Sequence, residues 1–460
     1  MAGNGDVGTL RARITGPVFV PSDPGYEDAR AVWNAAIDKH PAVIARCRSA
    51  EDVRAAIAFG REHGLPLAVR GGGHQVAGTG SIDDGLVIDL SELREVTVDP
   101  ERRTVRAEGG ARLGDLDRAT QEHGLAVPVG VVSETGIAGL TLSGGMGHLR
   151  RLHGLSCDNL LSADMVTADG RVVTANEEEH PDLLWALRGG GANLGVVTAF
   201  TFRAFPVGPQ VAFCFTLYPA DRATGVLRGC VDLASSMPDA VSPLAFLGRV
   251  PQADAFPAEA VGEPFVAVLA PHPGPPEEGE SVLRPLRELA EPIVDLSGRA
   301  SWVEVQALLD EDYPNGLRYY WTSVELTGLS QGAIDRLRAS ADAAPSDLST
   351  LDIWFQGGEM ARVEPDATGF GDRSAPIMIG VEANWEDPEL DEASISWARR
   401  CVRDLEPYST GGTYLNFGGF LEGGEAQVRR AVGEANFERL AAVRGTYDPD
   451  GVFDRQRPAR

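Results

Sequence analysis

Three glycine-rich loops, each beside an apolar strand, lie within the first 200 residues and limit what this chain can fold into. They lie at 71–73, 136–147 and 189–195. A run such as Gly71-Gly72-Gly73 costs conformational entropy and exceeds the one or two glycines that a turn needs. The run therefore indicates a backbone that approaches another group closely, with His74 held beside it.

Strands and helices alternate around these loops. Ser49 and Asp52 have the spacing of a capping box, which predicts a helix from there to His63, and Gly64 ends it. A second helix is expected at 112–123, and 181–202 reads as a helix, a loop and a strand. Apolar runs predict strands at 42–47, 65–69, 86–90, 96–100 and 104–110, and a hairpin at 166–175.

The composition changes near Pro206, where glycine clusters become rarer and aromatic residues more frequent. We therefore expect a first domain at 1–205 and a second, of strands with flanking helices, at 206–410. The last segment, 411–460, is expected to return to the first domain with a helix at 436–453.

The formal charge of −26 disfavours a nucleic-acid partner, because phosphates would be repelled. Lys39 is the only lysine, which fits either a GC-rich genome or a salt-adapted host. The five cysteines form no CxxC pair and indicate reduced thiols. No secretory signal and no membrane-length apolar run is visible, so we expect a cytoplasmic protein, as a monomer or homodimer.

Glycine-rich loops after strands often place backbone N–H groups around a phosphate. The Rossmann fingerprint fails here, since the residues after Gly73 open no convincing helix and no acidic residue follows at the expected distance. The P-loop pattern fails for want of a Gly-Lys-Ser/Thr sequence. His74 taken alone is equally consistent with a turn histidine that bonds locally.

Several ordered motifs over most of the chain resemble one family. They are Val32-Trp-Asn, Arg70-Gly-Gly-Gly-His74, Gly136-Ile-Ala-Gly-Leu140, Gly144-Gly-Met-Gly147, Gly154-Leu-Ser-Cys-Asp-Asn159, Leu184-Trp-Ala-Leu-Arg-Gly-Gly-Gly191, Asn193-Leu-Gly-Val-Val197, Gly357-Gly358, Phe370 with Arg373, Trp385, Trp397, Tyr414-Leu-Asn-Phe417 and Tyr447-Asp-Pro449 with Phe453. The chain resembles FAD-linked oxidases of the vanillyl-alcohol oxidase / p-cresol methylhydroxylase superfamily, in the berberine-bridge-enzyme-like branch.

The resemblance implies an α+β fold with a PCMH-type FAD-binding domain and a substrate domain built on an antiparallel sheet flanked by helices. It also implies FAD bonded covalently to His74. Some members carry a second, cysteinyl flavin link, but Val132 takes that position here, so we expect one link only. The FAD-binding residues it implies are Arg70, Gly71, Gly72, Gly73, His74, Gln75, Gly78, Ser81, Gly130, Thr135, Gly136, Gly139, Leu140, Gly144, Gly145, Gly147, His148, Asn193, Gly195, Val196, Tyr414 and Asn416.

Oxidation of an alcohol needs a base for the hydroxyl proton and an acceptor for a hydride. Tyr414 is the candidate base, and in a strand it would share a face with Asn416. The alternative for Tyr414 is an interface aromatic with a satisfied hydroxyl. Gln356 is a second candidate in the pocket, and Trp354 on the same face walls the substrate or belongs to the core.

Four other side chains have a functional and a structural interpretation. Arg373 matches a family arginine or forms a salt bridge to a nearby carboxylate, and Cys157 is interpreted as a small buried or loop residue. His148 is expected near the flavin, whereas His153 is expected at the surface. No metal-ligand spacing is evident. The Asp454-Arg-Gln-Arg-Pro ending replaces an Asn-rich one that is common in relatives.

The expected reaction is oxidation of a C–OH or C–N carbon of a small molecule such as a sugar, alcohol or secondary metabolite. Dioxygen, giving hydrogen peroxide, is the expected electron acceptor, and another carrier is the alternative. Two rival functions remain at this point. One is nicotinamide-dependent reduction, which the missing Rossmann pattern disfavours, and the other is a catalytically silent flavin-fold protein that only binds a ligand.

Overall fold

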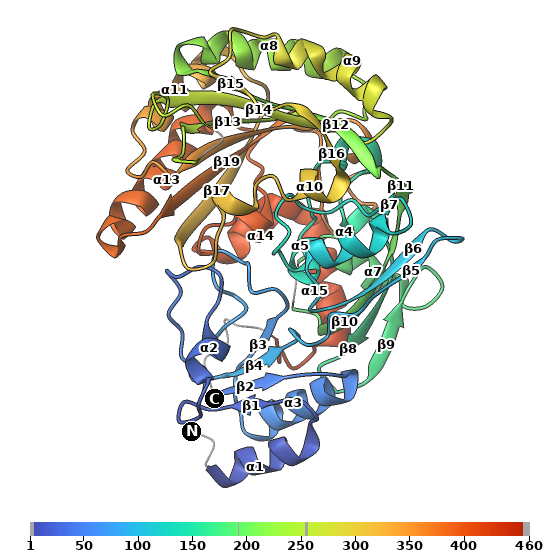
Figure 1. The fold of residues 1–460 in the computed structure, drawn as a ribbon. Coiled ribbons are helices and arrows are strands. Elements are labelled where there is room, and N and C mark those ends of the chain that lie inside the picture. The colour runs from blue at the N-terminus through green and yellow to red at the C-terminus, as the bar shows by residue number, and fades with distance from the viewer. Residues whose placement is uncertain (1–3, 192, 254–255, 454–460) are drawn as a thin grey trace.

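The computed structural model describes residues 4–191, 193–253 and 256–453, so the 454–458 motif lies outside the described residues. A large sheet forms one end of the molecule, and smaller sheets form the other (Figure 1). The expected α+β fold, with an antiparallel sheet flanked by helices, is confirmed. Within the described parts of the chain, no helix is long and apolar enough to cross a membrane.

The N-terminal sheet has the strand order β1-β2-β4-β3, with β2 and β3 parallel to β4. Ser49 begins α3 as predicted, because its side chain accepts the N–H of Asp52 at 3.1 Å. The elements are α1 Asn4–Arg13, β1 Val18–Phe19, α2 Tyr26–Arg30, β2 Val43–Arg46, α3 Ala50–Glu62, β3 Leu67–Arg70 and β4 Leu86–Asp89.

The second sheet is antiparallel, in the order β5-β6-β10-β8-β9, and β7 pairs separately with β11. The expected hairpin at 166–175 joins β8 to β9. The elements are β5 Val96–Asp99, β6 Thr104–Glu108, α4 Leu113–Gln121, β7 Leu125–Ala126, α5 Ile137–Leu142, α6 Arg150–His153, β8 Leu160–Val166, β9 Val172–Ala175, α7 Pro181–Leu187, β10 Val196–Arg203 and β11 Phe205–Pro206.

The third sheet, here called the roof sheet, is antiparallel, in the order β15-β12-β14-β13-β18-β19-β17 with β16 beside β12. Its strands are β12 Gln210–Pro219, β13 Leu244–Arg249, β14 Pro264–His272, β15 Val294–Asp295, β16 Gly298–Ser301, β17 Arg318–Leu326, β18 Thr350–Phe355 and β19 Ile377–Trp385. The helices of this region are α8 Ala223–Ser236, α9 Pro276–Arg287, α10 Trp302–Gln306, α11 Gln331–Asp342, α12 Glu359–Arg362 and α13 Asp391–Leu405.

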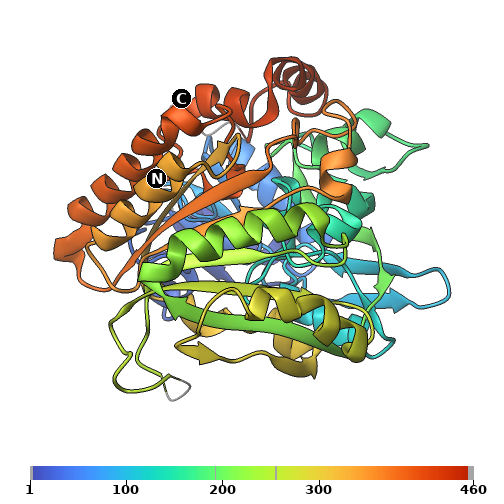
Figure 2. The ribbon, with the colours of Figure 1, turned by 90° about the horizontal axis from the view of Figure 1, so that it is seen from above.

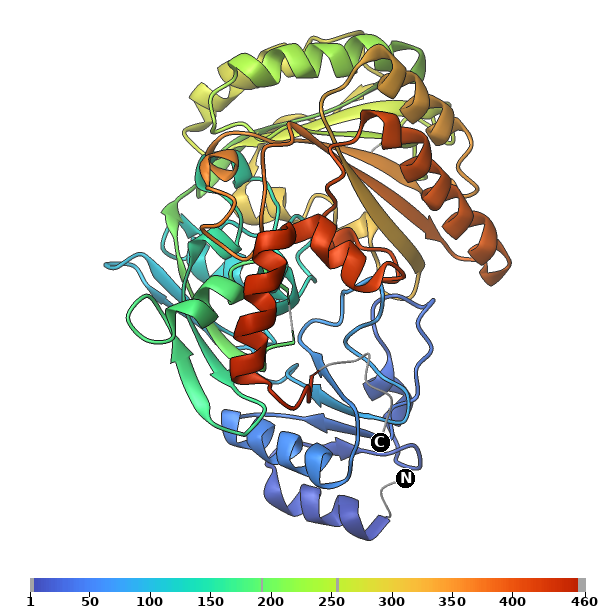
Figure 3. The ribbon, with the colours of Figure 1, turned by 180° about the vertical axis from the view of Figure 1, so that it is seen from behind.

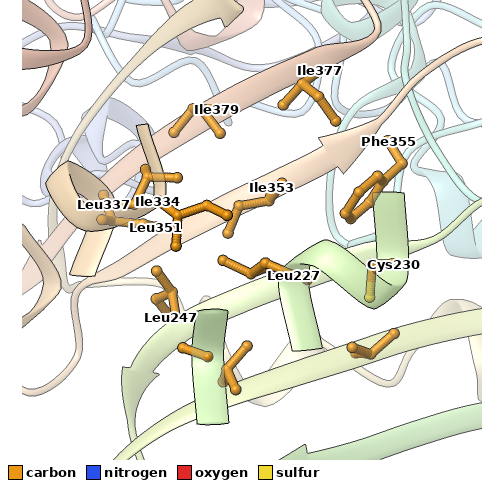
Figure 4. Close-up of a cluster of buried hydrophobic side chains, with 14 of the residues drawn as sticks. Leu227, Cys230, Leu247, Ile334, Leu337, Leu351, Ile353, Phe355, Ile377 and Ile379 are labelled. Atoms are coloured by element: carbon orange, nitrogen blue, oxygen red, sulfur yellow. The ribbon is translucent and has the colours of Figure 1, made fainter. Parts of the chain in front are cut away.

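Helices α8, α9, α11 and α13 cover the outer face of the roof sheet (Figure 2). Alternate residues of β18, such as Leu351, Ile353 and Phe355, pack against α8 and α11 in a buried apolar cluster (Figure 4). Because side chains alternate along a strand, Asp352 and Trp354 face the other way, toward the two smaller sheets. The outer face therefore supplies the core of this region, and the inner face packs in a second apolar cluster that also holds Trp33, Val132 and Tyr414.

The C-terminal segment returns to the smaller sheets, as expected, through α14 Gly424–Val432 and α15 Glu434–Tyr447 (Figure 3). The helix expected at 436–453 ends at Tyr447, since Asp448 precedes a proline and is disfavoured in the helical region. The strand expected around Tyr414 is wrong. Residues Leu415–Phe417 form a 3₁₀ turn instead, and Gly418 bridges to Thr322 of β17.

Candidate active site

The first two glycine loops touch each other through their backbones. A Cβ atom added at Gly72 would lie 2.5 Å from the backbone nitrogen of Gly136, and one added at Gly136 would lie 2.4 Å from that of Gly72. At Gly71 an added Cβ would lie 2.9 Å from the carbonyl oxygen of Gly109. These approaches leave no room for a side chain, which explains why the sequence places glycine at these positions.

His74 follows this contact and is held between two neighbours. Its ring stacks on the indole of Trp33, with centroids 4.4 Å apart and planes at 18°, and its Nδ1 lies 3.5 Å from the Thr135 hydroxyl. Its Nε2 is buried without a hydrogen-bond partner. Burial, with a smaller contribution from Arg112, lowers the pKa of His74 to about 3. The imidazole is therefore neutral at physiological pH.

Arg70 supports the first loop from below. Its guanidinium pairs with Asp89 at 2.8 Å and donates to the carbonyl oxygens of Ala29 and Ala31. Its aliphatic stem lies 3.5 Å from where a Cβ would stand at Gly73. Arg70 thus fixes the loop by its own bonds, and its guanidinium is engaged with protein groups.

The rest of the first loop supplies a tight turn and an unsatisfied hydroxyl. Gly78 has a φ of +62°, and an added Cβ there would lie 2.4 Å from Ile37. The side chain of Gln75 accepts the N–H of Ala77 and closes the turn. The Ser81 hydroxyl is buried without a partner.

The second loop is closed by Tyr414. The phenolic oxygen of Tyr414 accepts the N–H groups of Gly145 at 3.0 Å and Met146 at 3.2 Å, and the Asn416 side-chain amide at 2.9 Å. The same amide also donates to the carbonyl of Leu140 at 3.2 Å. Burial raises the pKa of Tyr414 to about 12, although the three N–H donors act in the opposite direction. Asn416 therefore meets Tyr414, as expected, but through a 3₁₀ turn.

The second loop also packs closely against β7 and its continuation. A Cβ at Gly147 would lie 1.7 Å from the carbonyl oxygen of Val129, and Gly130 lies against Leu140. The Thr141 hydroxyl on α5 is buried without a partner, while Gly139 opens onto free space. Sequence reasoning missed Thr141. The signal that could have found it was a hydroxyl within an otherwise apolar helical turn.

The third loop joins the second loop to the five-stranded sheet. The N–H of Gly191 donates to the carbonyl of Leu142 at 2.7 Å. Asn193 has a φ of +82°, and Gly195 packs against Val166 at the point where Val196 begins β10. The three predicted loops therefore converge around α5.

The inner face of the roof sheet carries buried polar groups without partners. Both polar atoms of the Gln356 amide and the Trp354 indole nitrogen are buried and unbonded. Asp352 and Glu382 are buried on this face as well. Sequence reasoning found Gln356 and missed the two carboxylates, because they lie on separate strands. No described contact joins Gln356 to Tyr414.

The structure shows the surroundings of four further side chains considered in the sequence analysis. Arg373 pairs with Asp158 at 2.6 Å, in agreement with its structural alternative. Cys157 is buried, and burial raises the pKa of its thiol. His148 is buried with both nitrogens unbonded, and burial lowers its pKa to about 3. His153 was expected at the surface, but it is half-buried because its ring stacks on Phe205.

These residues fit a large planar cofactor with a pyrophosphate. The backbones of 71–73 and 136–147 meet with no side chain between them, an arrangement here called the glycine cradle, and Gly139 opens onto free space. Buried unbonded atoms of His74, Ser81 and Thr141 around it lack the partners that a bound group would supply. In the described ranges, no three acidic, histidine or cysteine side chains gather as a metal site would require.

Comparisons with known proteins identify the cofactor. Residues 41–176 match the FAD binding domain family, and residues 413–458 match the berberine and berberine-like family. An uncharacterized FAD-linked oxidoreductase of Bacillus subtilis, YgaK, is 31% identical over 96% of both chains. The chain belongs to the FAD-linked oxidoreductase family. It is thus an FAD-dependent oxidoreductase of the berberine-bridge-enzyme-like branch, as its motifs indicated.

Solved structures agree with this placement of the FAD-linked oxidoreductase. The 6-hydroxy-D-nicotine oxidase of Arthrobacter nicotinovorans superposes with a TM-score of 0.85, at 29% identity over 96% of both chains. The BBE-like 1 protein of Physcomitrella patens superposes with a TM-score of 0.87 over 99% of both chains, and its 22% identity supports the fold alone.

Proposed function

We propose that this oxidoreductase oxidises a C–OH or C–N carbon of a small organic molecule, with FAD bonded covalently to His74. The observation that carries the proposal is the neutral, buried imidazole of His74 beside the glycine cradle, with Nε2 unbonded. A neutral imidazole has a free lone pair and is therefore the nucleophilic form. A glucooligosaccharide oxidase structure from Acremonium strictum is described as carrying a 6-S-cysteinyl, 8α-N1-histidyl FAD.

We propose a single covalent link. Val132 is 8% exposed and packs in the apolar cluster that also holds Trp33. A valine has no nucleophile to offer, and Cys157, in the same apolar cluster, has a buried thiol whose pKa is raised. His74, beside the contact between the first two glycine loops, is then the proposed attachment point.

We assign residues 1–205 and 411–460 to the binding of FAD and residues 206–410 to the substrate. The backbone N–H groups of 71–73 and 136–147 would donate hydrogen bonds to the pyrophosphate, and Trp33 would hold the His74 ring in place. Bound FAD would accept a hydride from the substrate carbon, and dioxygen would take both electrons to give hydrogen peroxide. Another electron carrier in place of dioxygen is the alternative.

For an alcohol substrate, Tyr414 is the proposed acceptor of the hydroxyl proton. Its oxygen receives three N–H donors, which would stabilise the negative charge of a phenolate. Its pKa of about 12 means that the ionised fraction increases with pH throughout the working range. Gln356, whose amide is buried and unbonded, is the proposed hydrogen-bond partner of the substrate.

Acid precipitation of the purified protein tests the covalent link. We expect yellow colour in the pellet, located on the peptide that contains His74. The His74→Ala variant should leave the colour in the supernatant or lose FAD, whereas His123→Ala, at an exposed histidine, should keep it in the pellet. FAD that remains fixed to the His74→Ala polypeptide would overturn the assignment. Colour in the wild-type supernatant would remove the covalent link and leave FAD binding intact.

Peroxide release tests the reaction itself. Sugars, alcohols and amines are supplied to the yellow protein in air, and peroxide is measured beside bleaching of the flavin under anaerobic conditions. Bleaching together with peroxide supports an oxidase. Bleaching with a slow return of colour in air supports a dehydrogenase with another acceptor, and no bleaching by any donor supports the ligand-binding alternative.

A further inference from the structure

Two carboxylates lie side by side on the inner face of the roof sheet. In the register of β18 and β19, Asp352 is opposite Gly380 and Thr350 is opposite Glu382. Asp352 and Glu382 are therefore diagonal neighbours on one face of the sheet. Their side chains are buried, with exposed fractions of 1% and 2%.

Neither carboxylate has a cationic partner among the described residues, in contrast to the buried Asp89 and the half-buried Asp158. Asp89 pairs with Arg70 and Arg46, and Asp158 pairs with Arg373. By contrast, Asp352 accepts the Thr350 hydroxyl at 2.8 Å, and its other hydrogen-bonding neighbour is Glu382, which also adjoins the Tyr313 hydroxyl. Oε2 of Glu382 is buried without any partner.

Arg150 is a buried cation near this face, and its bonds lie elsewhere. Its guanidinium stands 5.1 Å from the ring centroid of Trp354 and donates to the carbonyl oxygens of Gly147, Pro243 and Phe355. No ion pair joins it to Asp352 or Glu382 within the described ranges. The pair thus has no counter-charge from the residues that the structure describes.

Aromatic rings surround the pair. Trp321 is directly opposite Glu382 in the register of β17 and β19. The rings of Trp33, Tyr313, Tyr319 and Phe417 lie 5.0–5.7 Å from that of Trp321. Cation binding sites in proteins commonly combine such ring faces with carboxylates.

The pair also adjoins the residues assigned to the cofactor. A Cβ at Gly380 would lie 3.1 Å from the Phe417 ring and 3.4 Å from Cβ of Asp352, so the missing side chain lets the ring lie beside the carboxylate. Trp33, which stacks on His74, contacts Trp321 edge to face. A continuous row of rings therefore connects His74 to the carboxylates.

We propose that Asp352 and Glu382 form a subsite for a positively charged nitrogen of the substrate, with Trp321 and its neighbouring rings around that charge. This inference rests on the proposed function, because it names the class of compound that reaches the same site. The absence of a protein cation is what distinguishes the pair from a structural ion pair. A buried carboxylate without a partner is costly, and a bound cation removes that cost.

The electrostatics of the pair agree with a site that favours a positive charge. Burial raises the pKa of Glu382 to about 7, and burial together with Glu382 raises the pKa of Asp352 well above its usual range. The structural alternative is a pair that shares a proton and binds nothing. The two cases differ in whether the enzyme discriminates between a cation and a neutral molecule of the same shape.

Titration of the holoenzyme with matched probes distinguishes them. The probes are choline against 3,3-dimethylbutan-1-ol and benzylamine against benzyl alcohol, at constant ionic strength and without oxygen. Binding is read from tryptophan fluorescence and from the flavin spectrum. We expect at least one cation to bind about tenfold or more tightly than its neutral counterpart, the scale of one desolvated cation–ring contact. If the wild-type protein binds the cation and its neutral counterpart equally tightly in both pairs, that result by itself would overturn the proposal.

Variants locate the effect. Asp352→Asn and Glu382→Gln keep the shape and remove the charge, and each should reduce the preference for the cation several-fold. Glu386→Gln, at an exposed acid just after β19, should leave it unchanged. A cation preference that survives in the double variant would refute the assignment. Fluorescence reads binding even if the flavin is not covalent or no donor bleaches it, so failure of the proposed function would be seen separately.

Discussion

The indole of Trp33 lies between the imidazole of His74 and the phenol of Tyr319, stacked on both, with ring centroids 4.4 Å and 3.6 Å away. The Trp33 indole N–H also donates to the carbonyl of Tyr313 at 2.9 Å. Trp33 therefore connects the first glycine loop to the roof sheet. The orientation of the proposed flavin ligand depends on a residue of the N-terminal segment and on a strand far along the chain.

Replacement of this indole should impair attachment of FAD. In Trp33→Leu the His74 ring loses its stacking surface, so we expect a several-fold lower fraction of covalent flavin. The fraction is measured as acid-stable flavin absorbance per polypeptide. Trp397→Leu removes an equally buried indole from the outer core and should lower stability without lowering that fraction. Equal fractions in the two variants would contradict the role of Trp33.

Contact between the first two glycine loops should tolerate no methyl group. In Gly72→Ala the new Cβ would meet the backbone of Gly136, and we expect a loss of about 1–3 kcal/mol in the free energy of unfolding, or more. Gly445→Ala, in the exposed part of α15 with no atom within 4 Å, should instead stabilise by about 0.5–1 kcal/mol. Thermal unfolding of the apoproteins measures both. A neutral Gly72→Ala variant would show that the loops separate freely.

Tyr414→Phe should slow oxidation of an alcohol by roughly 10²-fold, the scale of a general base. Because the pKa of Tyr414 is about 12 and the ionised form is the active one, the wild-type rate of flavin reduction should rise with pH up to the limit of stability. The variant should lack this rise. Stopped-flow absorbance with a true substrate measures it, and Tyr447→Phe, whose hydroxyl contacts His180, is the control.

Glu382→Gln should change how stability depends on pH. The pKa of Glu382 is raised to about 7 in the folded protein, so the folded state holds a proton that the unfolded state releases above about 4.5. The wild-type free energy of unfolding should therefore fall as pH rises from about 5 to about 8. In the variant this fall should be smaller. Denaturant titrations at several pH values test it, and parallel curves would refute the raised pKa.

Val132→Cys should permit a second flavin link, since it places a thiol where the resemblance to the family implies the second attachment point. The expected result is a changed flavin spectrum and a tryptic peptide that joins both segments through FAD. Mass spectrometry of the acid-stable flavopeptides decides it. A free thiol that reacts quantitatively with iodoacetamide in the unfolded variant would count against the position of Val132.

Local features of the fold could be predicted from the sequence. The Ser49 cap, the strand before Gly71 and the hairpin near Asp169 depend on neighbours a few residues away, and the structure has each of them. The helix predicted at 436–453 begins two residues earlier, at Glu434, and ends at Tyr447, because Pro449 disfavours a helical backbone at Asp448.

The site could be predicted in part. The glycine loops and His74 are visible in the local sequence. The pairing of Asp352 with Glu382 depends instead on the register of two strands whose residues are about 30 positions apart. Stacking of Trp33 on Tyr319 likewise depends on the packing of the roof sheet over the loops. The 3₁₀ turn at Leu415–Phe417 was missed because hydrogen bonds to the second loop, rather than local propensity, set its backbone.

The C-terminal segment crosses from the roof sheet to the glycine loops, through the Gly418 bridge to Thr322 and the hydrogen bond from Asn416 to Leu140. During translation, Tyr414 and Asn416 leave the ribosome only after more than four hundred residues have been made. The second loop cannot be closed before that moment. If Tyr414 closes the loop around FAD as we propose, we expect a chain truncated before Tyr414 to retain less flavin than the full-length protein.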